Sequence, residues 1–422
     1  MIAEIITIGD ELLIGQVIDT NSAWIGKTLN AAGIQIIQIN SISDKAEEII
    51  ATLDKSLKRS KLILITGGLG PTRDDITKQT LARYFDSPLV VNQDALENVT
   101  AIFKRLNRPL LAVNKKQAEV PANCTILLNQ NGTAPGMWFE KDGSIIVSMP
   151  GVPYEMKGMV ENQVLPMLRS RFSLPAIIHH TILTAGIGES FLAEMISTVE
   201  DELPEHIKLA YLPALSLVRL RLSGYGADVK TLKASLEEQS GKIRAIISKY
   251  IITEEDIPIQ AAILKKLIAR KKTLSLAESC TGGYISHLLT SLPGSSQVFL
   301  AGVVSYSNAA KVNFLGVNSE TISSHGAVSE EVANEMVRGI LIKTGSDYAI
   351  AVTGIAGPDG GTEDKPVGTV WISAGDKHSV YARKFIFGNQ RAQNIERSAN
   401  SALAWLNTLI ERPEELRGKN NS

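Results

Sequence analysis

The chain has 422 residues, of which 44% are hydrophobic and 21% charged, and its formal net charge is −1. Because single domains usually span roughly 100 to 200 residues, this length predicts two or three of them. The near-neutral balance lacks the basic excess of most nucleic-acid binders, so a nucleic-acid partner is not expected.

The start of the chain, MIAEIITIGDELLIG, is apolar but carries three acidic residues. It lacks the basic flank and the cleavage site of a signal peptide, and no apolar run reaches the roughly 20 residues that cross a bilayer. The two cysteines, Cys124 and Cys280, lack the spacing of a zinc site or of a disulfide scaffold. We therefore expect a cytoplasmic protein that is not bound to a membrane.

Short strands alternate with helices in the first part of the chain. Apolar strands are expected at residues 2–8, 34–40 and 61–66, with helices at about 21–33 and 45–58 between them. This alternation predicts a parallel sheet covered by helices on both faces. Ligands of such sheets bind at the carboxyl ends of the strands.

The rest of the chain completes three predicted domains. Further strands and a closing helix extend the first α/β domain over residues 1–172, and a small α+β unit follows at residues 173–253. Five more strands among helices predict a second α/β domain at residues 254–415. Residues 416–422 are expected to form a disordered tail.

The stretch GGLGPTRDDIT follows the third strand of the first domain. Backbone amides of a glycine-rich turn that opens a helix can bind phosphate, and nearby carboxylates can hold a divalent cation against a pyrophosphate. The alternative is that Asp74 and Asp75 only cap the helix. The candidates for substrate binding are Gly67, Gly68, Gly70 and Thr72, and those for metal binding are Asp44, Asp74 and Asp75.

The segment LSLAESCTGG places a serine between a strand and a helix of the last domain. There Ser279 could be a nucleophile whose intermediate is stabilised by backbone amides, or simply an N-cap. No histidine is obviously paired with it, so another base is needed. Lys311 in VVSYSNAAK is the candidate, since a desolvated lysine can activate a hydroxyl.

Two further segments could contact a ligand of this domain. The loop VTGIAGPDGG is rich in glycines that allow close backbone approach, although it could be only a flexible loop. Arg391 follows the last strand and could pair with a phosphate in a bidentate manner.

Taken together, the ordered motifs resemble those of the CinA family, named for competence and damage inducibility. The resemblance covers essentially the whole chain through GDELLIGQVIDTN, GGLGPTRDDIT, NKKQAEVP, NGTAPGMWF, MPGVPYEM, AESCTGG, VVSYSNAAK, VTGIAGPDGGT and PVGTVW. It implies a first domain similar to the molybdopterin-binding fold and associated with metal-dependent cleavage of ADP-ribose. The middle unit resembles a KH-type module, but its GIGE segment lacks the GXXG clamp, which favours a spacer or dimer element.

The last domain resembles the nicotinamide-nucleotide amidases, which convert nicotinamide mononucleotide to nicotinate mononucleotide and ammonia without a cofactor. The resemblance implies that Ser279 is the nucleophile and that Tyr306 and Lys311 handle protons. It places Thr353 and Gly354 in the catalytic ligand loop and includes Arg391, which is expected to bind the phosphate of the substrate. Backbone amides near Gly282 and Gly283 are expected to hold the oxyanion, and Gly357 of the glycine-rich loop is a further candidate for substrate binding. A homodimer is expected as well. The competing hypothesis is a nucleotide- or pterin-binding, competence-linked interaction protein with one or both sites inactive.

Overall fold

A computed structural model describes residues 1–72 and 74–417 of the chain. The internal contacts divide the chain into two compact units. The first consists of residues 1–178 and 224–232, and the second consists of the remaining described residues. The helix α17 (Pro413–Arg417) includes Leu416, which is buried. Residue 416, where the disordered tail is expected to begin, therefore belongs to a helix, and residues 418–422 lie outside the described part of the chain.

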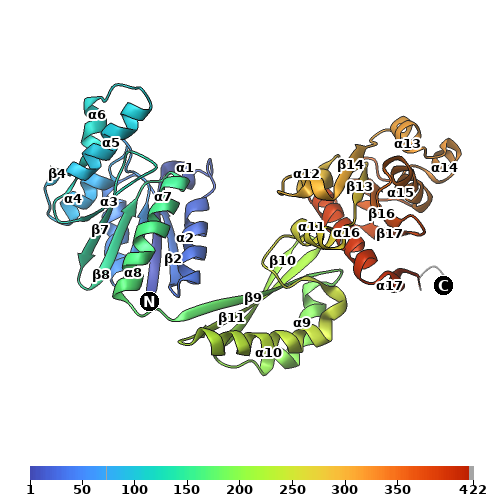
Figure 1. Ribbon diagram of the computed structural model, residues 1–422, viewed down its shortest axis with the longest axis horizontal. Helices are drawn as coiled ribbons and strands as arrows, with labels where there is room; N and C mark the ends of the chain where they lie inside the picture. The colour runs from blue at the N-terminus through green and yellow to red at the C-terminus, as the bar shows by residue number, and fades with distance from the viewer. Residues whose placement is uncertain (73, 418–422) are drawn as a thin grey trace. The chain divides into compact units, whose positions relative to one another are not determined.

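The first unit contains a six-stranded sheet in the order β2-β1-β3-β8-β7-β6 (Figure 1). Its first four strands are parallel, as the alternation predicts, but β7 and β6 are added antiparallel. The reason is the two-residue turn Asp142–Gly143, whose positive φ angles of 53° and 72° suit a tight hairpin. The strands are β1 (Ile2–Ile8), β2 (Gln35–Ile42), β3 (Leu62–Thr66), β6 (Thr125–Leu127), β7 (Gly136–Lys141) and β8 (Ser144–Met149).

Helices cover both faces of this sheet because its central strands are apolar on both sides. In β1, Ala3 and Ile5 belong to one core cluster, with α2, α7 and α8, whereas Ile6 and Ile8 belong to another, with α3 and α4. A short ribbon, β4 (Leu89–Val91) with β5 (Glu119–Pro121), lies beside them. The helices are α1 (Asp10–Leu13), α2 (Thr20–Ala31), α3 (Ala46–Leu57), α4 (Thr77–Tyr84), α5 (Gln93–Arg105), α6 (Ala112–Lys115), α7 (Pro153–Met159) and α8 (Leu165–Arg171).

The middle segment is a four-stranded sheet with two helices. The strands follow the order β10-β11-β9-β12, and α9 turns Leu192, Ile196 and Val199 inward at helical spacing. The elements are β9 (Ala176–Ala185), α9 (Glu189–Asp201), β10 (Ile207–Ala214), β11 (Leu217–Gly226), α10 (Val229–Ile247) and β12 (Ile251–Thr253).

The last segment is built on a five-stranded sheet in the order β14-β13-β15-β16-β17. Strands β14, β13 and β15 are parallel, and the long hairpin of β16 and β17 continues the sheet antiparallel. The elements are α11 (Ile259–Arg270), β13 (Leu274–Glu278), α12 (Tyr284–Thr290), β14 (Phe299–Val304), α13 (Asn308–Leu315), α14 (Ser319–His325), α15 (Glu330–Thr344), β15 (Tyr348–Gly354), β16 (Thr369–Asp376), β17 (Val380–Ile386) and α16 (Arg391–Glu411).

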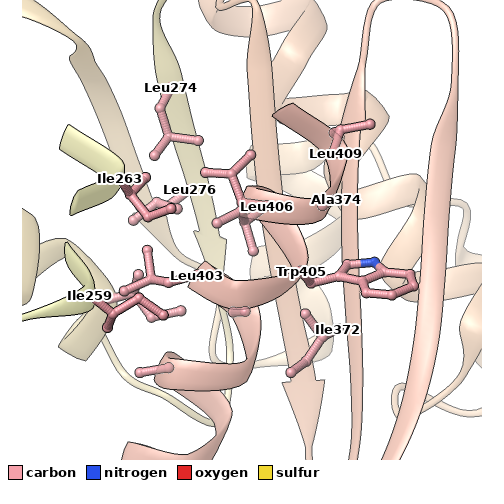
Figure 2. Packing of buried hydrophobic residues seen from close by; sticks show 14 of the residues in the cluster. Ile259, Ile263, Leu274, Leu276, Ile372, Ala374, Leu403, Trp405, Leu406 and Leu409 are labelled. Atoms are coloured by element: carbon pink, nitrogen blue, oxygen red, sulfur yellow. The ribbon is translucent and has the colours of Figure 1, made fainter. Parts of the chain in front are cut away.

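Two cores sandwich this sheet. On one face α11, α12 and α16 pack on the strands, and Figure 2 shows Leu403 and Leu406 of α16 near Ile263 of α11 and Leu276 of β13. On the other face α13, α14 and α15 cover the sheet. The expected fold class, α/β domains at both ends and a small α+β unit between them, is confirmed. No helix in the described part of the chain is both long and apolar enough to span a membrane.

Candidate functional site

A serine and a lysine meet at the carboxyl edge of the last sheet. Ser279 directly follows β13, while Lys311 stands in the first turn of α13, a helix capped by the Ser307 hydroxyl. Lys311 is 1% exposed, and its Nζ donates to Ser279 Oγ at 2.9 Å and to the Ser305 carbonyl at 2.9 Å. The parallel strands β13, β14 and β15 bring these groups together because their carboxyl ends share one edge.

The surroundings of Lys311 favour its neutral form. Burial lowers the pKa of its amine from the ordinary lysine value, because desolvation penalises the charged state. No ion pair with a carboxylate is found for it among the described residues. An amine of this kind can accept the proton of the neighbouring hydroxyl.

The two residues after the serine point elsewhere. Cys280 belongs to the buried core of α11, α12 and α16, and burial raises the pKa of its thiol to about 12. The Thr281 hydroxyl is buried and has no hydrogen-bond partner among the described residues. Of the three neighbouring candidates for a nucleophile, only Ser279 contacts the lysine.

The glycines expected to stabilise an oxyanion have other partners. The Gly282 amide donates to the Ser279 carbonyl at 3.0 Å, and the Gly283 amide donates to Glu278 Oε2 at 3.1 Å. The Glu278 carboxylate also accepts from the amides of Ile285 and Ser286, so it closes the amino end of α12. The N-cap residue is Gly283. The alternative that Ser279 caps this helix is therefore wrong.

Thr353 and Gly354 are engaged away from the serine. The Thr353 hydroxyl donates to the Ala327 carbonyl at 2.8 Å. Gly354 pairs with Val370 of β16, and a Cβ at this position would lie 2.7 Å from the Val370 Cγ2. The described contacts of Thr353 and Gly354 thus stabilise the position of β15 against Ala327 and β16. None of these contacts involves Ser279 or Lys311.

Arg391, Gly357 and Tyr306 form a second group at the same edge. Arg391, the first residue of α16, donates from Nη1 to the Gly357 carbonyl at 2.8 Å and from Nη2 to Tyr306 Oη at 2.9 Å. Gly357 has φ of +88° and would place a Cβ 2.5 Å from Val367. Since 58% of Tyr306 is exposed, the group faces solvent and is open to a ligand.

The glycine-rich turn of the first unit lies where β1 and β3 end. Gly67 has φ of +116°, and its Cβ would lie 2.2 Å from the Ile8 carbonyl; at Gly68 it would lie 2.1 Å from Thr77 Oγ1. At Gly70 a Cβ would meet the Asp75 carboxylate at 2.5 Å. These three glycines line a cavity of about 370 Å³, and only residues without a side chain allow so close an approach.

The predicted acidic residues also line this cavity, together with Glu11 and Glu155. Asp75 accepts from the amide of Thr72 at 2.9 Å and from the hydroxyl of that threonine, which fixes the turn. Helix α4 starts at Thr77, and its N-cap, Ile76, makes no side-chain hydrogen bond. The alternative that Asp74 or Asp75 caps this helix is therefore wrong.

Carboxylates crowd together at this cavity. Burial raises the pKa of Asp44, and the negative charges of Asp10, Glu11 and Asp74 raise it further. No three acidic, histidine or cysteine side chains converge on a metal site within residues 1–72 and 74–417. The arrangement does not fit an ion held by protein ligands alone. It does fit a hard cation held by one or two carboxylates and completed by phosphate oxygens.

Three family models match consecutive parts of the chain. They are "Probable molybdopterin binding domain" at residues 4–170, "Damage-inducible protein CinA KH domain" at residues 179–253, and "CinA C-terminal domain" at residues 256–410. The chain is 47% identical to a CinA-like protein of Flavobacterium psychrophilum over 405 residues, which cover 96% of this chain and 97% of that protein. The chain belongs to the CinA family.

Other CinA relatives show the same coverage. A CinA-like protein of Cytophaga hutchinsonii is 44% identical over 98% of this chain and 99% of its own length. Among solved structures, the competence/damage inducible protein CihA of Agrobacterium tumefaciens is 37% identical and covers 36% of this chain and 94% of its own, with a TM-score of 0.36. The middle segment of this CinA-family chain is accordingly of the KH type.

Sequence reasoning missed several residues of these CinA-family sites. It gave no role to Glu278, which closes α12, or to the carbonyls of Ser305 and Ala327. In the first unit it missed the buried Glu155, which accepts from Asn129 Nδ2 at 2.6 Å beside the glycine turn. Glu278 could have been found from the sequence, because it is an acidic residue at the end of an apolar strand and shortly before a helix. No local sequence pattern marks the carbonyl groups of Ser305 and Ala327.

Proposed function

We propose that the last domain hydrolyses the carboxamide of nicotinamide mononucleotide to give nicotinate mononucleotide and ammonia. The observation that carries this proposal is the 2.9 Å contact between the buried Lys311 amine and Ser279 Oγ. Such a pair supplies a nucleophile and its base without a metal or an organic cofactor.

The reaction can be written with the groups present at this edge. The Ser279 hydroxyl transfers its proton to Lys311 Nζ and attacks the carboxamide carbon. The tetrahedral intermediate expels ammonia, which takes up the proton from Lys311, and an acyl ester remains on the serine. Water, deprotonated by the same amine, then cleaves the ester and restores the hydroxyl. Because Tyr306 bonds to Arg391, the direct route through Lys311 is the one that the contacts support.

The oxyanion is assigned to amides nearer the serine than Gly282 and Gly283, both of which already have acceptors. Among the described residues no backbone acceptor is found for the Thr281 amide. Donors fixed in advance at the place where charge develops are the usual stabilisers of such an intermediate. Arg391, with Gly357 and Tyr306, is proposed to hold the nucleotide phosphate.

Ammonia release by the purified full-length protein tests the amidase. Production of ammonia and nicotinate mononucleotide in equal amounts is expected, and its loss in Ser279→Ala would tie the reaction to this site. If no preparation releases ammonia but the protein binds the nucleotide, the competing interaction protein is the better description.

A second activity, metal-dependent cleavage of ADP-ribose at its pyrophosphate, is proposed for the first unit. It is supported by the glycine turn and by the group of carboxylates around Asp44, whose pKa is raised by burial and then by these neighbouring charges. One or two of the candidates Asp44, Asp74 and Asp75 would hold a divalent cation together with phosphate oxygens, and the cation would neutralise phosphate charge and lower the pKa of bound water. Thr72 orients Asp75, and the backbone at Gly67, Gly68 and Gly70 leaves room for the phosphates. Formation of AMP that stops on addition of a chelator is the test.

A cytoplasmic homodimer remains part of the proposal. It is supported by exposed apolar residues at the end of α1 and directly after it, namely Leu13, Ile14, Val17 and Ile18, because patches of this kind mark association sites. Light scattering at micromolar concentrations should give twice the chain mass, and a strictly monomeric mass would contradict the dimer.

A further inference from the structure

A cavity of about 650 Å³ lies within the second unit, between the loop before α9, strand β17 and the carboxyl-terminal half of α16. None of its lining residues belongs to the group around Ser279, Lys311 and Arg391. Small-molecule sites usually have volumes of roughly 300 to 1,000 Å³. The cavity is therefore large enough for a ligand, and the proposed amidase makes no use of it.

Aromatic rings form one wall of this cavity. Phe385 and Phe387 stack with their centroids 5.6 Å apart and an interplanar angle of 22°. Trp405 is only 8% exposed and is held by a hydrogen bond from Nε1 to the Tyr381 carbonyl at 2.9 Å. Figure 2 shows that its indole projects from α16 on the side away from Ile259 and Ile263. These fixed, flat surfaces suit a planar ring system.

Positive charge gathers at the same rings. The Arg383 guanidinium lies 5.2 Å from the Phe385 centroid and 5.6 Å from the Trp405 centroid, and Lys249 Nζ lies 4.8 Å from the Tyr250 centroid. No ion pair is found for Lys249 or Arg383 in the part of the chain that the structure describes. Arg412 and Glu415 also line the cavity, but they form an ion pair with each other at 3.3 Å, so Lys249 and Arg383 supply the positive charge that a ligand could use.

We propose that this cavity binds a nucleotide. Its rings would stack on the base, and its cations would pair with the phosphates. The loop Gly186–Gly188 lines the opposite side and leads into the thirteen-residue helix α9. A Cβ at Gly186 would have nothing within 4 Å, so there is space there for a phosphate beside the backbone.

A small nucleotide fits these observations better than a nucleic-acid strand. The site is a cavity walled by several elements that come from different parts of the second unit, whereas strand-binding proteins present a long basic groove. The whole chain carries a net charge of −1, so the excess of positive charge at this cavity is local and does not reflect a basic protein. Because the cavity and the Ser279 group share no residues, nicotinamide mononucleotide at the proposed amidase site would not displace the ligand.

Photolabelling of the full-length protein with 8-azido-ADP, in excess nicotinamide mononucleotide, tests the proposal. Label is expected on peptides containing Tyr250 or residues 383–387. Arg383→Gln should lower both this labelling and the ADP affinity of the site by about tenfold, since a phosphate loses a charged partner. The control is Lys384→Gln, which makes the same charge change at the next residue of β17, outside the cavity lining. It should leave both unchanged.

A second variant on another element guards against a local folding defect. Lys249→Gln changes an exposed side chain and should weaken ADP at the same labelled peptides. Label at the glycine turn of the first unit should stay constant in every variant, which separates the two sites. Absence of label in the cavity at millimolar ADP, or equal affinity in Arg383→Gln and Lys384→Gln, would overturn the proposal. The proposal would also be overturned if a single-stranded RNA protected these peptides from labelling more strongly than ADP does, and if this protection depended on Lys384.

Discussion

The two candidate sites of this chain differ in how far their polar groups satisfy one another. At the last sheet, Lys311 bonds to Ser279, and Arg391 bonds to Gly357 and Tyr306. At the first sheet, carboxylates lie near one another, and burial, followed by these negative charges, raises the pKa of Asp44. The first arrangement is complete within the protein, whereas the second has an excess of negative charge that an external cation would offset.

This difference indicates two ways in which the proposed nucleotide sites could be prepared for their ligands. A site with internal partners holds its catalytic groups in place before the substrate arrives, which reduces the reorganisation needed for reaction. In a site of mutually repelling carboxylates, the side chains reach their final positions only when a cation and the substrate bind. The amidase should therefore be insensitive to chelators, and the pyrophosphatase should depend on a metal.

The strongest test of the internally completed site is Ser279→Ala. Loss of the nucleophile should lower ammonia release by about four orders of magnitude or more, with substrate binding largely kept. Turnover and the KM for nicotinamide mononucleotide are the measurements. The matched control, Cys280→Ala, removes a thiol in the core and should cost little. The opposite pattern would make this a thiol amidase.

The pH profile examines the base. Lys311 must be neutral to accept a proton, so kcat/KM should rise with pH and level off above the pKa of Lys311. Because burial lowers that pKa, the plateau should start below the range in which ordinary lysines titrate. Lys311→Met should lower the rate by about three orders of magnitude and remove this inflection. A profile that keeps the inflection in Lys311→Met would show that another group is the base.

The charge-repelling site is tested by Asp75→Asn. Cleavage of ADP-ribose should fall by about a hundredfold, because a group that stabilises charge in the transition state is neutralised, and ammonia release should not change. Asp94→Asn, at the exposed start of α5, is the control for a lost charge in this unit. Full hydrolysis in Asp75→Asn, or in the presence of a chelator, would remove the contrast between the two sites.

A smaller effect is expected at the phosphate contact of the amidase. Arg391 makes two directed hydrogen bonds, which lysine cannot reproduce with a single ammonium group. Arg391→Lys should raise the KM for nicotinamide mononucleotide by about tenfold and change kcat less. Arg397→Lys, on the same helix, serves as the control. Equal KM values in the two variants would place the phosphate elsewhere.

The smallest change in rate is expected for Glu278→Gln, which tests how the helix end supports the serine. The carboxylate accepts from three backbone amides and the Ser286 hydroxyl. Its replacement should cost about 2 kcal/mol of the free energy of unfolding and lower turnover only a few-fold. Thermal unfolding is the measurement, with the exposed Glu330→Gln as control. An unchanged Tm would show that the cap contributes no stability.

Much of the fold follows from local sequence patterns. Apolar runs such as LILIT and the glycines after them predict the strands and the edge at which residues gather. For the same reason the sequence groups Ser279 with Lys311, since consecutive parallel strands end at one edge. The antiparallel addition of β7 depends on a two-residue turn at Asp142 and Gly143, whose effect on strand direction was overlooked.

The partners of individual groups could not be predicted in the same way. Whether the Gly283 amide is free depends on where the Glu278 carboxylate turns, and the Thr353 hydroxyl bonds to Ala327, a residue 26 positions away. Such contacts depend on side-chain rotamers and loop paths, which spacing does not encode. The crowding of Asp44 by Asp74 likewise arises only when two loops meet.

The burial of Cys280 bears on how the protein withstands oxidants. Its thiol lies in the core, is 6% exposed, and has its pKa raised to about 12, so it supplies almost no thiolate for peroxide or alkylating agents. An amidase that used this neighbouring sulfur would be inactivated whenever the cell's reducing capacity failed. If Ser279 is the nucleophile, as proposed, the proposed amidase should keep its activity after treatment with peroxide.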